Sequence, residues 1–312
     1  MEQRTLTSAP SILPLYARAA APLIPGASLL PFVPGRGKEI PDVELTLPDV
    51  VADRDAVADY AKVCGFTLRD TLPATYPHVL AFPLHMAVMA DGSFPFGAVG
   101  LVHVENRIVQ YRPIGIGEQL TLRVRATKLE PHPKGRTFSI VSEAHVGAEL
   151  VWEDVSTMLR RGGGRSDAPA AGKGAKPSPK GSEASATASA EWKLGGDLGR
   201  RYAAVSGDRN PIHMHALTAK PLGFPRAIAH GMWTKARALA ALESRLPSAF
   251  AVDVGFRRPI PLPGAVAFAS ESDGEAIRFT VRDAERGTPH VDGQLDPLTA
   301  KQKTSTRRRK AA

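Results

Sequence analysis

The stretch of sequence that decides the fold is Tyr202–Trp233, YAAVSGDRNPIHMHALTAKPLGFPRAIAHGMW. Asp208 and His213 lie five positions apart in it, with a proline between them. A carboxylate and an imidazole that a proline turn holds at this spacing form a candidate pair for proton transfer. The stretch ends in H-G-M, with Gly231 at the predicted start of a helix, where a backbone N–H group can bind developing negative charge.

The residues that follow predict a helix covered on one side by a sheet. Within residues 230–246, HGMWTKARALAALESRL, one face carries Met232, Ala236, Leu239, Leu242 and Leu246. Strands with alternating apolar residues are then predicted near 250–258, 264–272, 276–284 and 288–296. A helix followed by a run of strands predicts an α+β fold rather than alternating β-α-β units.

A faint repeat places the same order of elements in the first half of the chain. Residues 60–66, YAKVCGF, align with residues 202–208, YAAVSGD. Strands of the first half are predicted near 99–111, 117–130, 135–147 and 149–159. Between the halves, residues 161–190 are rich in Gly, Ala, Ser, Pro and Lys and have no large apolar side chain, which predicts a flexible linker.

These patterns divide the chain into an extended N-terminal cover (1–40), a first domain (41–160), the linker (161–190), a second domain (191–298) and a disordered basic tail (299–312). The net charge of +9 is concentrated outside the two domains. Residues 301–312 carry six basic residues and no acid, and residues 160–183 carry six basic and two acidic residues. A nucleic-acid-binding domain normally carries its positive charge on a folded face, so we expect no nucleic-acid partner.

Cysteine content and apolar patterning predict a cytoplasmic protein. Cys64 is the single cysteine, which excludes an intramolecular disulfide and suits a reducing compartment. No apolar run in the sequence is long enough to span a bilayer. Prolines interrupt the apolar start of the chain repeatedly, whereas a signal peptide has an unbroken apolar core.

The stretch 202–233 resembles the hydratase motif of the MaoC-like family of hot-dog-fold (R)-specific enoyl-thioester hydratases and dehydratases. That motif has an aromatic residue and small residues, then S-G-D-x-N-P-I-H, G-F and A-H-G-M, and each element occurs here in order. The resemblance implies two hot-dog domains in one chain, each a curved antiparallel sheet around a central helix. It also implies a hydro-lyase of fatty acid metabolism that interconverts trans-2-enoyl and (R)-3-hydroxyacyl thioesters without a cofactor. The carrier would be coenzyme A or acyl-carrier protein, and a homodimer is possible.

The resemblance further implies roles for the residues of the motif. Asp208 and His213 would transfer protons and activate water, and the Gly231 N–H group would bind the thioester carbonyl oxygen. Four residues are expected to support them: Asn210, Ser206, Tyr202 and His230. Asn210 would hold the loop through its side chain. His230 would either contact the ligand or cap the helix start, with capping slightly favoured.

The first half has lost this motif. Phe66 occupies the position of Asp208, and if Tyr76-Pro77 fixes the register, Phe82 occupies that of His230 and Pro83 that of Gly231. Proline has no N–H group, so the carbonyl-binding donor is absent there. Phe66 and Phe82 are therefore candidates for an acyl-binding pocket, although both are equally compatible with an ordinary core.

The sequence also allows a metal site, roles for other histidines and other activities. His213, His215, Asp208 and His230 have a spacing weakly compatible with a metal, but neither a cysteine nor a second spaced acid pair supports one, so no metal is expected. Most histidines outside the motif are expected to be surface or internally bonded residues. The exception is His85, near the start of the predicted first-half helix, which is the one candidate for a site residue among them. An acyl thioesterase of the same fold, a non-catalytic acyl-binding or assembly subunit, and weak nucleic-acid binding by the tail are the alternatives.

Overall fold

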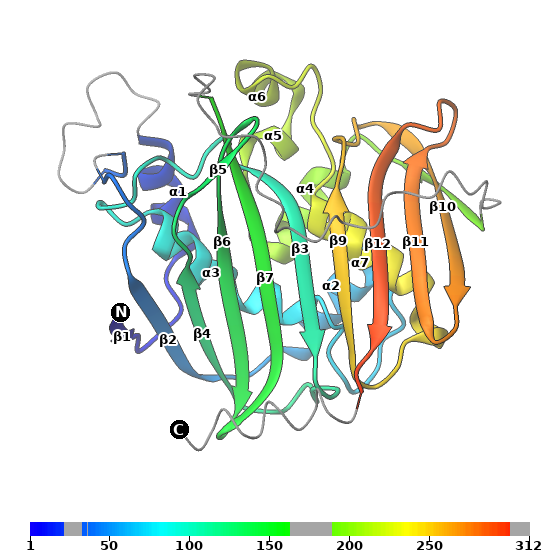
Figure 1. The fold of residues 1–312 in the computed structure, drawn as a ribbon, viewed down its shortest axis with the longest axis horizontal. Helices are drawn as coiled ribbons and strands as arrows, with labels where there is room; N and C mark the ends of the chain where they lie inside the picture. The colour runs from blue at the N-terminus through cyan, green and yellow to red at the C-terminus, as the bar shows by residue number, and fades with distance from the viewer. Residues whose placement is uncertain (22–32, 36, 163–188, 300–312) are drawn as a thin grey trace.

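The computed structural model describes residues 1–21, 33–35, 37–162 and 189–299 (Figure 1). The predicted linker and tail therefore lie almost entirely outside the described residues. Within these ranges, twelve strands form one sheet in the order β1-β2-β4-β6-β7-β3-β9-β12-β11-β10-β8, with β5 paired to β6. None of the described helices is long and apolar enough to cross a membrane.

The predicted strands of both halves are present, and the first half has three more and the second half one more. The first half contributes β1 (Glu2–Thr5), β2 (Val43–Val50), β3 (Val102–Gln110), β4 (Leu120–Ala126), β5 (Glu130–His132), β6 (Gly135–Val146) and β7 (Glu149–Arg161). The second half contributes β8 (Ala190–Leu194), β9 (Phe250–Phe256), β10 (Gly264–Asp273), β11 (Ala276–Asp283) and β12 (Pro289–Pro297). Sequence periodicity did not predict the short strands β1, β5 and β8, or β2, which has a register shift between Leu47 and Val50.

The two halves have the same strand order and meet at one seam. The order β2-β4-β6-β7-β3 in the first half corresponds to β8-β10-β11-β12-β9 in the second, and the antiparallel pair β3 and β9 joins them. At this seam Ile108 pairs with Val252 and Asn106 with Val254. Because the seam continues the hydrogen-bond ladder, neither half has an open edge where they join.

Helices lie on one face of the sheet, behind it in the view of Figure 1. They are α1 (Ile12–Ala20), α2 (Arg54–Cys64), α3 (Tyr76–Met89), α4 (Leu198–Ser206), α5 (Pro211–Met214), α6 (Ala216–Ala219), the 3₁₀ turn η3 (Lys220–Leu222), α7 (Gly231–Ala241) and η4 (Glu243–Arg245). The long central helices are α3 in the first half and α7 in the second. The α+β class predicted from helix and strand periodicity is confirmed.

The repeated glycine has the same structural role in both halves. Gly65 follows the last residue of α2 with φ 85°, and Gly207 follows the last residue of α4 with φ 75°. This left-handed conformation ends a helix without the steric cost that a side chain would add, which is why both copies of the repeat have glycine here.

The N-terminal segment differs from the extended cover that proline spacing predicted. Residues 12–20 form α1, whose buried residues Leu15 and Ala19 are four positions apart. A helix tolerates proline in its first turn, so Pro14 does not prevent it. The expectation of an extended segment is wrong for these residues, and α1 brings Tyr16 to the site described next.

Candidate active site

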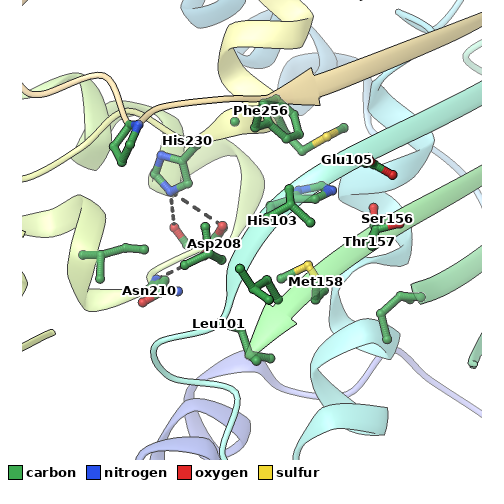
Figure 2. Close-up of a pocket in the computed structure, with 18 of the residues that line it drawn as sticks. Leu101, His103, Glu105, Ser156, Thr157, Met158, Asp208, Asn210, His230 and Phe256 are labelled. Atoms are coloured by element: carbon green, nitrogen blue, oxygen red, sulfur yellow. Dashed lines mark hydrogen bonds and ion pairs between the residues drawn. The ribbon is translucent and has the colours of Figure 1, made fainter. Parts of the chain in front are cut away.

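A cavity of about 600 Å³ lies between the two halves of the molecule and holds the predicted site (Figure 2). The second half lines it with the motif loop and the first turn of α7, and the first half lines it with α3, β3, β6 and β7. All seven motif residues predicted to form or support a site line this cavity: Tyr202, Ser206, Asp208, Asn210, His213, Gly231 and His230. The loop between α4 and α7 thus brings these motif residues to one side of the cavity.

Local sequence explains how the loop presents its acid and its histidine. Gly207 ends α4 in a left-handed turn, so the chain reverses and places Asp208 beside the cavity. Pro211 is the first residue of the short helix α5, where its missing N–H group and fixed φ are favourable, and His213, two residues later, is buried. A side chain at Gly199 would collide with the His213 carbonyl group, so glycine permits α4 to pack directly against α5.

The Asp208 carboxylate is held by three groups. The Tyr16 hydroxyl donates to Asp208 Oδ1 at 3.0 Å, the Asn210 N–H group donates to the same oxygen at 3.1 Å, and His230 Nε2 lies 3.8 Å from Oδ2. Burial by itself would raise the pKa of Asp208, but the imidazoles of His230 and His213 and these hydrogen bonds outweigh burial and lower it. Asp208 is therefore ionised at neutral pH.

His213 is held in one tautomer. Its Nδ1 lies 2.7 Å from the Ile228 carbonyl oxygen, and a carbonyl can only accept, so Nδ1 carries the proton and Nε2 has a free lone pair. Burial lowers the pKa of His213, although the Asp208 charge opposes it. The ring is neutral at pH 7 and can act as a base through Nε2.

His230 occupies the N-cap position of α7 without capping the helix through its side chain. Its Nε2 instead donates to the Asp208 backbone oxygen at 3.0 Å, and its ring stacks on His213 with centroids 3.7 Å apart. Burial lowers its pKa to about 3, so the ring is neutral. The expectation that His230 caps the helix is wrong, because the loop passes close enough for the ring to bind Asp208.

Gly231 is the first residue of α7, so its N–H group has no acceptor within the helix. A Cβ atom at this position would lie 3.0 Å from the ring of Phe256, closer than side chains normally approach. Glycine therefore lets the cavity wall and the helix start pack together. Gly231 also lines the cavity, where a ligand oxygen can approach its N–H group.

The supporting residues act partly as predicted. The Ser206 hydroxyl accepts from the Asp208 N–H group at 3.2 Å, and the Tyr202 ring packs against His230 with centroids 4.8 Å apart. Asn210 fixes the loop through its backbone, whereas its side-chain Oδ1 is buried with no hydrogen-bond partner among the described residues. The prediction that the Asn210 side chain holds the loop is therefore wrong.

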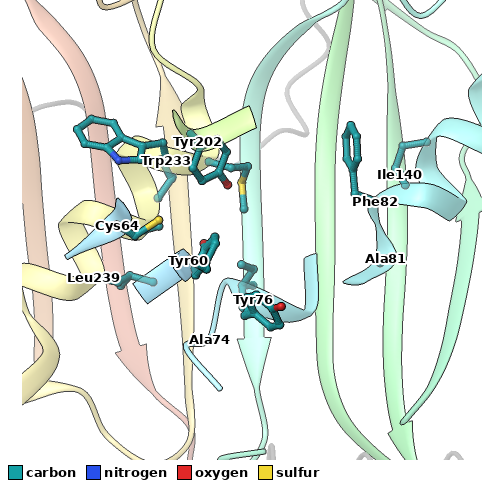
Figure 3. Close-up of a cluster of buried hydrophobic side chains, with 14 of the residues drawn as sticks. Tyr60, Cys64, Ala74, Tyr76, Ala81, Phe82, Ile140, Tyr202, Trp233 and Leu239 are labelled. Carbon is teal, nitrogen blue, oxygen red and sulfur yellow. The ribbon is translucent and has the colours of Figure 1, made fainter. Parts of the chain in front are cut away.

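Of the two phenylalanines proposed for an acyl pocket, Phe82 lines the cavity and Phe66 does not. Phe66 is half-buried and stacks on Tyr60, with ring centroids 6.5 Å apart. Tyr60 in turn lies 6.1 Å from the ring of Tyr202, within the buried cluster of Figure 3. Phe66 is a packing residue because α2 lies against α4 and directs it away from the cavity.

Sequence reasoning missed two groups of residues. Tyr16 lies in a segment with repeated prolines, and the signal that could have found it is the helical spacing of Leu15 and Ala19. The second group is polar and lines the same cavity from α3 and β3: His78 and His103, beside His85, which the sequence had singled out. His78 and His85 are seven positions apart, two turns on one helix face, which is a detectable signal for a shared environment.

Two groups of side chains have ligand atoms close enough to hold a metal ion. They are Asp208, His213 and His230, and His78, His85 and Asp154, with the atoms of each group within 4.8 Å of one another. In the first group the Nδ1 atom of His213 and the Nε2 atom of His230 carry the protons that they donate to carbonyl oxygens. The absence of a metal requirement stays a prediction.

Comparisons with known proteins agree with this geometry. A sequence model described as the MaoC like domain matches residues 182–294. The 3-hydroxyacyl-thioester dehydratase X of Mycobacterium tuberculosis (strain ATCC 25618 / H37Rv) is 38% identical over 291 residues, which cover 93% of this chain and 99% of that protein. The crystal structure of HtdX of Mycobacterium tuberculosis superposes with a TM-score of 0.72 at 34% identity, covering 82% of this chain and 100% of that one.

A more distant structure bears on the fold alone. A conserved hypothetical protein of Mycobacterium tuberculosis, described as a double hot-dog fold, superposes with a TM-score of 0.51 at 15% identity, over 80% of this chain and 93% of that one. Together with the strand order of the two halves, these likenesses confirm the predicted double hot-dog architecture.

Proposed function

The chain belongs to the family of MaoC-like dehydratases, and on this basis we propose that it catalyses the reversible hydration of trans-2-enoyl thioesters to (R)-3-hydroxyacyl thioesters. The observation that carries the proposal is the meeting of three groups at one cavity. An ionised Asp208, a neutral His213 and the N–H group of Gly231 all line it. Hydration needs a base near the Cα–Cβ bond and a hydrogen-bond donor at the thioester oxygen, and this set supplies both.

In the hydration direction, Asp208 and His213 activate a water molecule. Asp208 Oδ1 already accepts hydrogen bonds from Tyr16 and Asn210, so Oδ2 is the oxygen that can orient the water. His213 Nε2 takes a proton from the water while its oxygen bonds to Cβ. The electron pair of the Cα–Cβ double bond moves toward the thioester oxygen, which becomes enolate-like.

The N–H group of Gly231 donates to this developing negative charge at the positive end of α7. The protonated His213, stabilised by the Asp208 carboxylate, then returns its proton to Cα, and both residues regain their starting charge. One imidazole therefore serves both transfers from one face of the substrate. Dehydration follows the same steps in reverse.

Carrier and location belong to the same proposal. The substrate is an acyl thioester, carried by coenzyme A or acyl-carrier protein, and basic side chains at the cavity, such as Arg258 and Lys134, suit the phosphate groups of either. We assign the protein to the cytoplasm and to fatty acid metabolism. Two fused halves already form a pair, and a homodimer of the whole chain stays a possibility.

The test is loss of enoyl-thioester absorbance with crotonyl-CoA and a longer trans-2-enoyl-CoA. Wild type should hydrate at least one of them to the (R)-3-hydroxy product, and Asp208→Asn and His213→Ala should each lower kcat by about 10²-fold or more. The control is His215→Ala, because His215 is exposed and does not line the cavity. Its kcat should match wild type.

Other outcomes would assign a different activity. Release of free thiol without loss of the double bond would make the protein a thioesterase. No reaction by folded wild type, with either coenzyme A or acyl-carrier-protein thioesters, would indicate a non-catalytic acyl-binding subunit. Full activity in both variants would remove Asp208 and His213 from the mechanism.

A further inference from the structure

Three histidines of the first half, from α3 and β3, form a polar lobe of the cavity. His78 and His85 on α3 have ring centroids 5.0 Å apart, and His103 on β3 stacks 6.5 Å from His78. All three line the cavity that contains Asp208. Figure 2 shows His103 between the Asp208 loop and strand β7. A thioester bound at the reaction centre would therefore share the cavity with these three rings.

Two of these histidines are held by buried partners. His78 Nδ1 lies 2.8 Å from Asp154 Oδ2, and His85 Nε2 lies 2.7 Å from Ser142 Oγ. Asp154 is fully buried and also accepts from the Asn106 side chain. These bonds fix both rings and occupy Nδ1 of His78 and Nε2 of His85. The lobe is thus a prearranged polar surface in a place where an aliphatic chain would favour leucine or phenylalanine.

His103 is the exception within this lobe. Its Nε2 is buried and has no hydrogen-bond partner among the described residues. Its ring packs on Phe256, the residue that also backs Gly231, with centroids 5.0 Å apart. Burial, with His78 beside it, lowers the pKa of His103 to about 3, so the ring is neutral and offers one donor and one acceptor. A buried polar atom left unpaired is costly, and on a ring that lines a cavity a ligand can supply the missing partner.

We propose that His103 binds a hydroxyl group on the acyl chain, so that the preferred substrates are thioesters that carry a second oxygen beyond C3. This inference rests on the proposed function for the position of the thioester. A hydroxyl group both donates and accepts, so it pairs with a neutral imidazole in either tautomer. An unsubstituted chain would leave His103 Nε2 unpaired in the complex, and binding would be weaker by that cost.

Binding of unreactive, saturated thioesters tests the proposal without requiring turnover. Calorimetric titration would compare octanoyl-CoA with its 5-, 6- and 7-hydroxy derivatives, which scan the depth of the chain. We expect at least one hydroxy derivative to bind wild type about tenfold more tightly than octanoyl-CoA. His103→Phe, which keeps a ring of similar size, should remove this ratio, and His103→Gln, which keeps a donor and an acceptor, should retain part of it.

The matched control is Met158→Leu, which alters the shape of the same cavity but not its polarity, and it should preserve the ratio. Equal binding of all four thioesters by wild type, no binding of any, or a ratio that persists in folded His103→Phe would each overturn the proposal. Hydration of crotonyl-CoA, measured in parallel, separates the two hypotheses. Wild type that hydrates crotonyl-CoA but shows no hydroxyl preference retains the proposed function and loses the subsite.

Discussion

Individual side chains at the site depend on neighbours from distant parts of the sequence. Asp208 is separated by 192 positions from Tyr16, whose hydroxyl also accepts the Arg209 N–H group at 2.7 Å. One phenol thus bridges two consecutive residues of the loop. Burial and the adjacent Asp208 charge raise the pKa of Tyr16, so it remains a hydrogen-bond donor at any working pH. Tyr16 is a positioning residue that acts through Asp208.

Tyr16→Phe should therefore shift the pH profile of the reaction. Removing the hydroxyl takes away a group that lowers the pKa of Asp208, so that pKa rises. Because the mechanism needs ionised Asp208, the acid limb of kcat/KM should move to higher pH, by roughly half a unit to one unit. The control is Leu13→Ala, an exposed position on the same helix. A uniform loss of activity with an unmoved acid limb would reduce Tyr16 to a structural role.

Gly231→Ala should impair catalysis more than folding. The new Cβ would press on the Phe256 ring at 3.0 Å, and overpacking of this kind costs about 1–3 kcal/mol. The helix start must then shift relative to the substrate, and kcat/KM should fall by about tenfold or more. The double variant Gly231→Ala, Phe256→Leu, which relieves the contact, should recover stability in thermal unfolding. Unchanged kcat/KM in Gly231→Ala would contradict the prediction and show that the Phe256 ring moves instead of the helix start, because alanine keeps the N–H group.

At the scale of elements, a buried lysine joins α7 to the seam between the halves. Lys235, one turn after Gly231, donates to the backbone oxygens of Asn106 on β3 at 3.3 Å and of Val252 on β9 at 3.1 Å. Burial lowers the pKa of Lys235 to about 7, despite the opposing Asp154 charge. The same residue therefore fixes the catalytic helix to both halves and carries a titratable proton in the core.

Lys235 should make stability depend on pH above neutrality. Its pKa is lower in the folded state than in the unfolded state, so between about pH 7 and 10.5 the unfolded state binds more protons and stability rises with pH. Urea unfolding at pH 7, 8 and 9 should show this rise in wild type. Lys235→Met should flatten it and, at pH 9, should be less stable, since the carbonyl groups of Asn106 and Val252 lose a partner. Identical slopes in the two proteins would refute this account.

At the scale of the whole molecule, one sheet joins the two halves and one cavity lies between them, but the two halves contribute different residues to that cavity. The second half supplies the catalytic loop. The first half supplies α3 and strands of the cavity wall, and α1, whose Tyr16 holds Asp208. Several histidines from both halves are buried around it. Burial lowers the pKa values of His85, His103 and His230 to about 3 each. The fold therefore keeps these rings neutral where the unfolded chain would protonate them.

This arrangement predicts loss of stability in mild acid. The histidine pKa values are lower in the folded state, so from about pH 6.5 down to about pH 3 the unfolded state binds more protons and stability falls as pH falls. Each histidine adds a slope of at most about 1.4 kcal/mol per pH unit. Chemical denaturation at pH 7, 6 and 5 should show the decline, and His103→Phe should reduce its slope. A free energy of unfolding that is constant over this range would contradict the buried, neutral rings.

The sequence by itself determined the features that depend on local order. Periodicity predicted the α+β class and most strands, and the repeated glycine marked the ends of two equivalent helices. The motif at 202–233 identified Asp208, His213 and Gly231, because the loop that presents them is continuous in sequence. Tertiary structure alone decided what lies around them, since these contacts join residues that no local pattern connects. Folding brought Tyr16 to Asp208, packed Phe66 against Tyr60 and placed His103 opposite the catalytic loop.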